Sequence, residues 1–552
     1  MRYIFGFLIL FSLFFISSCS QNSNADIIYV NAKIWTGDST NSRANSIAIK
    51  DSLIIFVGTD YAPYKGSNTE VIDLEGKMIV PGFIDNHTHF LAGGYQLASV
   101  NLRNAQTPAA FINTLKEFVS TVNDDRWIQG GDWDHEAWGG ELPRKEWIDS
   151  VTGNHPIYVN RYDGHMVLVN SFVLAKAGIH KNTPDPEGGE IIRDSKTGEP
   201  TGVLKDEAMG LVSRFIPDAS EKELDESLQR AIQHAWENGV TQIFDMGGSG
   251  GWTDLNTYQR AHRNGQLNLR IYSHVPISSW KKLDSLVKKD GRGDDMLRWG
   301  GLKGFVDGSL GSTTAWFFEP YLDEPTSSGL VVTDTMLLRQ WVIAADSAGL
   351  HIATHAIGDR AINWLLNVYE ESQSKTKRDH RSRIEHAQHI HQKDLARFAS
   401  LQVIPAMQPY HAIDDGRWAY KRLDDERLKG TYAFGSLLNA NALLTFGSDW
   451  SVAPLEPITG IYAAVTRRTL DDKNPDGWYP DQKITVEQAL KSYTVNNAYA
   501  GFHEDKTGKL KKGMLADLVV LSHDLFTVDP ENIKNVEVIR TMVNGKEVFV
   551  RK

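Results

Sequence analysis

Two histidines separated by one residue, His87 and His89, end an apolar run that begins at Met78. If this run is a β-strand, residues two apart share a face, so both imidazoles point the same way and can hold one cation. Neutral imidazole is a common ligand for zinc and related metals. A His-x-His pair alone does not distinguish a metal site from histidines that are hydrogen-bonded at a strand end. The spacing therefore indicates a metal site that needs further ligands from elsewhere in the chain.

Short apolar runs alternate with helical stretches between residue 77 and about residue 501, as parallel strands and their crossover helices do. Eight such units form a (β/α)8 TIM barrel, whose active site lies at the carboxyl ends of the strands. The sequence thus predicts an α/β protein with a barrel over residues 78–503. The eight expected strands are residues 78–86, 240–244, 269–272, 301–306, 351–354, 383–385, 402–406 and 443–446.

Four further metal-competent residues stand at the ends of later strands. The fourth expected strand offers Lys303, the fifth His355, the sixth His386 and the eighth Asp449. Because barrel enzymes gather their chemistry at that end of the strands, these side chains and the His-x-His pair are expected to meet. The chain has only 18 histidines, so composition does not readily explain such a register.

This constellation resembles the amidohydrolase superfamily, and within it the branch called amidohydrolase family 3, which includes N-substituted formamide deformylases and exported metal-dependent hydrolases. The likeness covers nearly the whole chain and is specific for the fold and the metal site. It is carried by the segments GFIDNHTH at 82–89, KGFVDGSLGS at 303–312, HAIGDRA at 355–361, RIEHAQ at 383–388, FGSD at 446–449 and GMLADL at 513–518.

The resemblance implies a binuclear metal centre. His87 and His89 would hold the more buried ion, and His355 and His386 the more exposed one. Lys303, carboxylated on its amine by CO2, would bridge both ions, with Asp449 as a further ligand beside the hydroxide. The implied cofactors are two divalent metal ions, zinc first, with iron, manganese or cobalt as alternatives.

The physical chemistry of Lys303 agrees with a carbamate. A bare ammonium inside a dry barrel and facing cations would be costly, whereas a carbamate anion becomes a ligand. The alternative is an ordinary ion pair between Lys303 and Asp307, which would imply a mononuclear site.

The reaction implied by the resemblance is hydrolysis of a carbon–nitrogen bond, other than a peptide bond, in a small amide-like substrate. Divalent cations lower the pKa of bound water to about 7. Asp449 would act as general base toward that water and as general acid toward the leaving nitrogen. Two alternatives stay open: a mononuclear deaminase of the same superfamily, and a non-catalytic surface lipoprotein that binds a ligand.

The interval between the first two strands, residues 100–225, is too long for one crossover and predicts an inserted, lid-like subdomain. Its tryptophans include Trp133 and Trp138, which could form an aromatic lid over the substrate. His165 is a further substrate-facing candidate, because the family has a histidine in this context. Tyr410 and His411, after the seventh strand, could reach the mouth of the site.

Both chain ends are rich in short alternating strands, at residues 26–77 and 504–552. Such strands are typical of a small β-sandwich. Strand-rich ends around a different middle predict one sandwich domain assembled from both termini, with the barrel inserted between them. The sandwich and the barrel flanks could support a homodimer.

The first 18 residues have the form of a secretory signal, an apolar run too short for a comfortable membrane span. Residues 16–19 resemble a bacterial lipobox, with acylation at Cys19, the only cysteine, so the chain can form no internal disulfide. Residues 19–25 would be the tether. The expected protein is exported and held to the bacterial cell envelope by its lipid anchor alone, at the outer membrane facing the periplasm.

The formal net charge of -11 argues against nucleic acid as a partner, which needs a concentrated basic surface. No basic run changes that conclusion. The expected partner is a small molecule.

Overall fold

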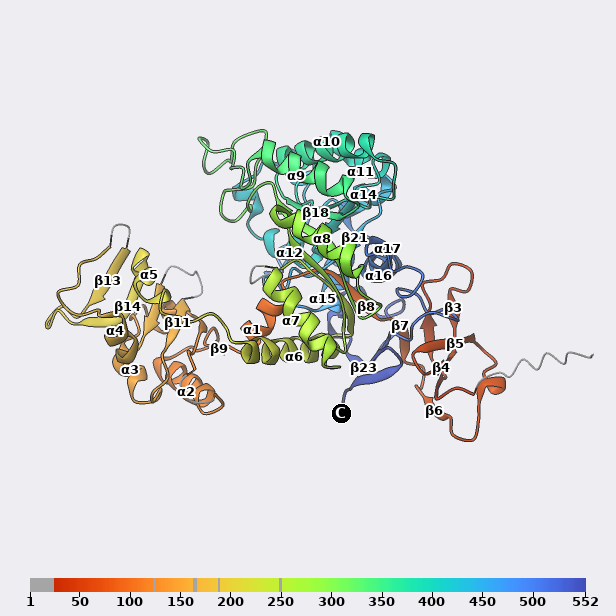
Figure 1. The fold of residues 1–552 in the computed structure, drawn as a ribbon, viewed down its shortest axis with the longest axis horizontal. Helices are drawn as coiled ribbons and strands as arrows, with labels where there is room; N and C mark the ends of the chain where they lie inside the picture. The colour runs from red at the N-terminus through yellow and green to blue at the C-terminus, as the bar shows by residue number, and fades with distance from the viewer. Residues whose placement is uncertain (1–23, 123–125, 162–165, 187–188, 248–250) are drawn as a thin grey trace, which may run out of the picture.

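The computed structural model describes residues 24–122, 126–161, 166–186, 189–247 and 251–552 (Figure 1). The expected signal peptide, Cys19, most of the tether and His165 lie outside these ranges. No helix within them is both long and apolar enough to cross a membrane.

The central element is a barrel of eight parallel strands in sequence order, from β8 to β21. The two ends of this sheet meet where Thr88 forms a parallel bridge with Trp450 and the Asp449 amide donates to His87 O at 2.8 Å. Each of the eight predicted strands therefore overlaps a strand of the barrel. Their bounds are β8 Phe83–Thr88, β15 Val240–Asp245, β16 Arg270–Pro276, β17 Leu297–Phe305, β18 His351–Ala356, β19 Arg383–His386, β20 Ile404–Met407 and β21 Thr445–Phe446.

The first predicted strand, 78–86, is wrong in one respect, because it consists of two strands in two different sheets. β7 (Met78–Pro81) pairs with the end-built sheet, and β8 continues into the barrel. The chain passes from one to the other at Gly82, where an added Cβ would lie 2.2 Å from Thr241 Oγ1. The apolar run has no polar break at this point, so its periodicity could not reveal the division.

Helices cover the outside of the barrel (Figure 1). In α10 (Asp359–Lys375) the buried side chains Ile362, Leu365, Leu366 and Tyr369 recur at the spacing of one helical face. The capping box of Ser220 and Glu223 begins the longest helix of the β8-to-β15 connection. The other covering helices are α6 Glu221–Glu237, α7 Trp252–Arg263, α8 Trp280–Asp290, α9 Thr335–Ser347, α11 Leu395–Ser400, α12 Pro409–Asp415, α13 Asp425–Lys429, α14 Phe434–Asn439, α15 Pro457–Thr466, α16 Val486–Tyr493 and α17 Val495–Ala500.

Both chain ends build the β-sandwich. One sheet has the order β5-β4-β1-β6, and the other has the order β24-β23-β22-β7-β2-β3, which joins strands from the two termini. Ile34, Ile47 and Val520 belong to the apolar core of this sandwich. The strands are β1 Ile27–Val30, β2 Lys33–Trp35, β3 Arg43–Ala44, β4 Ser46–Lys50, β5 Leu53–Gly58, β6 Glu70–Asp73, β22 Leu518–Leu521, β23 Val538–Val543 and β24 Lys546–Val550.

The insertion after the first barrel strand has a six-stranded sheet of its own, in the order β13-β14-β12-β11-β10-β9. Two separate apolar clusters belong to it, so it has its own core. It lies to one side of the barrel, beyond α1 (Phe90–Leu97) and α6 (Figure 1). Its elements are β9 Val100–Asn101, α2 Pro108–Val119, β10 Gly130–Trp133, α3 Lys145–Asp149, β11 Tyr158–Arg161, β12 Met166–Val169, α4 Ser171–Ala177, β13 Gly189–Arg193, β14 Pro200–Asp206 and α5 Gly210–Ser213.

Candidate metal centre and active site

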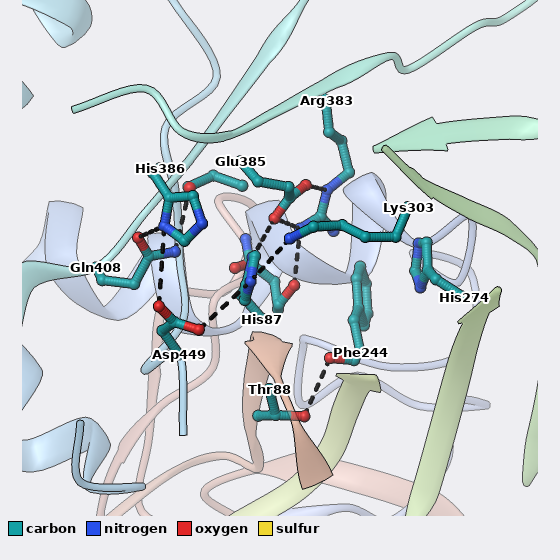
Figure 2. A network of polar contacts seen from close by, with 12 residues as sticks. His87, Thr88, Phe244, His274, Lys303, Arg383, Glu385, His386, Gln408 and Asp449 are labelled. Atoms are coloured by element: carbon teal, nitrogen blue, oxygen red, sulfur yellow. Dashed lines mark hydrogen bonds and ion pairs between the residues drawn. The ribbon is translucent and has the colours of Figure 1, made fainter. Parts of the chain in front are cut away.

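The ends of β8, β17 and the segment after β21 bring polar side chains together inside the barrel. His87 Nε2 lies 3.2 Å from Lys303 Nζ and 3.5 Å from Asp449 Oδ1. His89 Nε2 lies 3.3 Å from the same Asp449 oxygen. One ligand atom from each of His87, His89 and Asp449 lies within 4.8 Å of the others. Figure 2 shows Asp449, His87 and Lys303 turned toward one another.

β18 and β19 add two more imidazoles to this cluster. The ring of His386 lies 4.7 Å from that of His87 and 4.5 Å from that of His355, centroid to centroid. His386 Nδ1 is 4.0 Å from Asp449 Oδ2. The structure thus brings together all six residues that the sequence suggested for the centre.

Each of the four imidazoles uses one ring nitrogen on a protein acceptor. His87 Nδ1 lies 2.5 Å from Glu385 Oε2, and His89 Nδ1 lies 2.6 Å from Gly247 O. His386 Nδ1 contacts Gln408 Oε1 at 2.8 Å, and His355 Nε2 contacts Gly308 O at 2.9 Å. Such partners fix the ring and its tautomer and leave the other nitrogen free to bind an ion. The hydrogen bond of each ring is therefore compatible with metal binding through its second nitrogen.

The tautomers of His87 and His89 supply a test of whether the site suits a cation. A proton on each Nδ1 serves the carboxylate of Glu385 and the carbonyl of Gly247, so each Nε2 is an acceptor, and that of His87 has Lys303 Nζ at 3.2 Å. Both Nε2 atoms face Asp449 Oδ1, which is buried and has no hydrogen-bond donor of its own. Acceptors that face one another at 3.3 and 3.5 Å repel unless positive charge lies between them. The donor set therefore fits a divalent metal.

The same fold occurs in proteins of known structure. A profile of the amidohydrolase family matches residues 70–549. The chain belongs to this family.

Relatives of this chain match nearly its whole length. It is 39% identical over 539 residues to the protein LONG AFTER FAR-RED 3 of Arabidopsis thaliana, covering 95% of this chain and 92% of the relative. It is 26% identical over 551 residues to the N-substituted formamide deformylase of Arthrobacter pascens, and this match covers 94% of this chain and 97% of the relative. A structure of an uncharacterized metal-dependent hydrolase from Pyrococcus horikoshii superposes with a TM-score of 0.75 at 29% identity. The superposition covers 91% of this chain and 99% of that structure. These findings support a hydrolytic function and a divalent metal.

Burial sets the protonation states of the residues in this centre. Burial, followed by the positive charge of Lys303, lowers the pKa of His87 to about 4 and that of His355 to about 3. Both imidazoles are therefore neutral, as a metal ligand must be, at any ordinary pH. Burial also lowers the pKa of Lys303 to about 8, against the opposing charges of Glu385 and Asp449.

A buried ion pair lies directly behind His87, and the sequence reasoning missed it. Arg383 Nε and Nη2 donate to the two carboxylate oxygens of Glu385 at 2.7 and 2.9 Å, and Nη2 also donates to Asn86 O at 2.7 Å. Burial opposes ionisation of Glu385, but Arg383 and His87 outweigh it and hold its pKa well below the ordinary value. The available signal was the Arg-x-Glu alternation in β19, which places both side chains on the same face of the strand.

Two of the central residues have left-handed backbone conformations. His386 has a φ of 71° and Asp449 a φ of 64°. Neighbours in a strand face opposite sides, so Glu385 and His386 could not both reach the interior if the strand continued regularly. Non-glycine residues at positive φ cost about 1–3 kcal/mol each and gather at functional sites.

Lys303 and Asp307 do not form the ion pair that was the alternative to a carbamate. The Asp307 carboxylate instead accepts from the backbone amides of Trp316 at 2.7 Å, Ile357 at 3.0 Å and Gly358 at 2.8 Å. Asp307 therefore organises the loops after β17 and β18, a role that the sequence did not reveal.

The remaining candidates differ in their distance from the centre. His411 Nε2 is buried without a hydrogen bond, 3.8 Å from Asp449 Oδ2. Tyr410, its neighbour in α12, is half-buried against the barrel core. Among the described residues, His411 is thus a candidate to touch substrate, and Tyr410 has no contact with the six central residues.

The predicted aromatic lid requires a correction. Trp133 is fully buried in the core of the insertion, where its Nε1 donates to Val159 O at 2.9 Å. Trp138 packs on Phe111 and Trp147 in the same core. Neither side chain faces the metal-competent cluster, because the insertion needs large apolar groups to fill its own interior. His165 lies outside the described residues.

Proposed function

We propose that this chain hydrolyses a carbon–nitrogen bond, other than a peptide bond, in a small amide-like molecule. The observation that carries the proposal is the convergence of two imidazole nitrogens, Nε2 of His87 and of His89, on the Asp449 carboxylate, beside an amine with a lowered pKa. The name of the relative from Arthrobacter pascens, N-substituted formamide deformylase, supports an amide-like bond. Water adds across that bond, so the products are a carboxylic acid and an amine.

His87, His89, His355, His386 and Asp449 would hold two divalent ions, and Lys303 would bridge them. Such ions supply hydroxide at neutral pH and polarise a carbonyl group. Asp449 takes the proton of the attacking water and returns it to the departing nitrogen, since its carboxylate lies among the proposed ligands. The buried barrel interior excludes bulk water from these groups.

The proposed bridge depends on carboxylation of Lys303. A pKa of about 8 leaves roughly one amine in ten uncharged at pH 7, and only the uncharged amine attacks CO2. Nζ then forms a bond to the CO2 carbon and loses a proton, so the side chain becomes an anion with two oxygen ligands. This step replaces a positive charge in the centre by a negative one.

Metal counting and mass spectrometry test the proposal. The protein, beginning after the proposed signal and grown with bicarbonate, should contain about two divalent ions per chain and the added mass of one carboxyl group on Lys303. Lys303→Ala should lose much of the metal, whereas Lys512→Ala, at an exposed position, should not. Asp449→Asn should keep the fold and lower kcat on a cleaved amide by about 10²–10⁴-fold. Asp476→Asn, exposed, is its control.

The outcomes separate the competing functions. Near-normal turnover by Asp449→Asn would refute the assignment of the proton-transfer group. One ion, unaffected by Lys303→Ala, would favour the mononuclear deaminase, consistent with the tight group that His87, His89 and Asp449 form among the described residues. No metal at all would favour the ligand-binding lipoprotein.

We also propose that the chain is exported and acylated at Cys19. The support is the lipobox-like sequence before that cysteine. Membrane fractionation of cells that express the wild-type chain or Cys19→Ser tests it, because the variant should leave the membrane fraction. A wild-type chain that is not found with membranes would contradict the anchor.

A further inference from the structure

A cavity of about 390 Å³ adjoins the metal-competent cluster on the side of β15, β16 and β17. His89 and Lys303 form part of its wall, so it opens directly onto the groups to which the reaction is assigned. Among the described residues that line it, these two are the only ones with ionisable side chains. The rest of the wall is mainly apolar and includes Met246, Pro276, Ile277, Phe305 and Trp341, which we call the apolar pocket.

Phe305 connects the apolar pocket to the centre. It stands two residues after Lys303 in β17, so the two side chains share a face of the strand. Lys303 Nζ lies 5.0 Å from the centre of the Phe305 ring, and that ring lies 5.3 Å from the ring of His355. A group bound against Phe305 would therefore also be close to the scissile bond.

The exposure of Phe305 indicates that the pocket is built for an apolar occupant. This phenylalanine is 39% exposed although its neighbours Gly304 and Val306 are buried. The apolar surface continues along α9, where Leu337, 41% exposed, lies one turn before Trp341 on the same face. Covering such apolar surface is favourable by about 25 cal/mol per Å². A charged substituent would find no ionisable partner among the described lining residues other than His89 and Lys303, so its burial there would be costly.

The size of the pocket bounds the occupant. A cavity of about 150 Å³ with aliphatic and aromatic walls is enough to bind benzene. The pocket is more than twice as large, which suits an aryl ring or a short branched alkyl chain together with the group to be cleaved.

We propose that the substrate carries an uncharged aryl or alkyl substituent next to its amide-like bond, and that this substituent binds in the apolar pocket against Phe305. This inference rests on the proposed function, because it names the substrate class of the same reaction. Phe305 and Trp341 are then specificity-determining residues.

Binding to metal-free protein tests the pocket independently of catalysis. N-benzylacetamide and N-methylphenylacetamide place a ring on either side of the amide, and N-methylacetamide has none. Titration of chelator-treated protein, followed by calorimetry, should show that at least one ring-bearing amide binds 10-fold or more tightly than N-methylacetamide. Phe305→Ala should weaken that ligand about 10-fold, and Phe305→Leu should restore part of the affinity.

Phe318→Ala is the matched control. Phe318 is 44% exposed, in the same region of the chain, but it lines a different cavity with Asp359 and His391. This variant should bind the ring-bearing amide as the wild-type protein does. Equal binding of all three amides, or unchanged affinity in Phe305→Ala, would overturn the proposal.

Turnover of the metal-loaded protein separates failure of this inference from failure of the proposed function. Cleavage of N-methylacetamide as fast as of the ring-bearing amides would leave carbon–nitrogen hydrolysis standing and overturn the apolar specificity. Ring-dependent binding that is lost in Phe305→Ala, without cleavage of any amide, would support the apolar pocket and contradict the proposed reaction.

Discussion

Replacement of Glu385 by Gln should weaken both metal binding and the fold, because this carboxylate serves two buried partners at once. His87 Nδ1 lies 2.5 Å from one oxygen, and Arg383 donates to both oxygens. The side chains of His87, Arg383 and Glu385 are all fully buried. Glutamine keeps the size of the side chain and removes its charge.

The magnitude follows from the hydrogen-bond inventory. An amide has one oxygen and one NH2 group, whereas His87 Nδ1–H and Arg383 require an acceptor at both positions. One donor must therefore face another donor, and the Arg383 charge loses its counter-ion. Breaking a buried pair costs about 3–5 kcal/mol of stability. Loss of the carboxylate behind a metal-bound imidazole costs about 10–100-fold in metal affinity.

Two assays separate these effects. Denaturant unfolding of metal-free protein measures the stability change, and competition with a chelator measures the metal affinity. Glu487→Gln, which breaks an exposed pair with Lys491, should change the unfolding free energy by less than about 0.5 kcal/mol and leave metal affinity unchanged.

A double variant, Arg383→Met with Glu385→Gln, sharpens the test. Removal of the unpaired cation should restore part of the stability, but the imidazole of His87 would still lack its carboxylate, so metal affinity should stay low. If Glu385→Gln binds metal within twofold of the wild-type protein, the reasoning that Glu385 orients His87 and strengthens it as a ligand is refuted.

Three further changes probe the rest of the fold. Gly82→Ala should destabilise the protein by about 1–3 kcal/mol in denaturant unfolding, because the added Cβ meets Thr241. A second substitution, Thr241→Gly, should remove that clash. Equal stability of Gly82→Ala and the wild-type protein would contradict the close packing. Trp133→Ala should cost about 3–5 kcal/mol in unfolding of the insertion without changing metal content, whereas a loss of metal would contradict a purely structural role. Burial lowers the pKa of His274 to about 3, so between pH 6.5 and 3 only the unfolded chain binds a proton at this group. The free energy of unfolding should therefore fall by about 1.4 kcal/mol for each unit by which the pH is lowered in this range. His274→Asn should flatten that slope in metal-free unfolding at several pH values, and an unchanged slope would refute the assignment.

The sequence was most informative where strand periodicity and chemistry coincide. Lys303 and His355 end neighbouring parallel strands, and the register that pairs Gly304 with Thr354 also brings their side chains to one edge. Because parallel strands end on the same side of a barrel, positions along the chain sufficed to group these residues. The common direction of the strands was therefore enough to group Lys303 and His355, without any measured distance between them.

The role of Glu385 could not be inferred in the same way. Its partner His87 is 298 residues away along the chain, and their contact depends on which side chains meet across the barrel interior. Trp133 shows a different limit of sequence reasoning. A large aromatic residue in an insertion can belong to a lid over the substrate or to the core of the insertion, and its residue type does not distinguish the two. Only the packing around its ring decides between them.

The division at Gly82 explains why both chain ends belong to a protein whose chemistry lies in the middle. The Gly82 amide donates to Asp517 O at 3.0 Å, at the point where β7 passes into the strand that carries His87 and His89. The Asp517 carboxylate in turn accepts from Arg270 Nε at 2.5 Å and from the Asn544 amide at 2.7 Å. Arg270 begins β16, the third barrel strand, and is buried. The C-terminal strands therefore hold the start of the His-x-His strand, and the acidic residue of the 513–518 segment acts there as a structural anion, remote from the reacting groups.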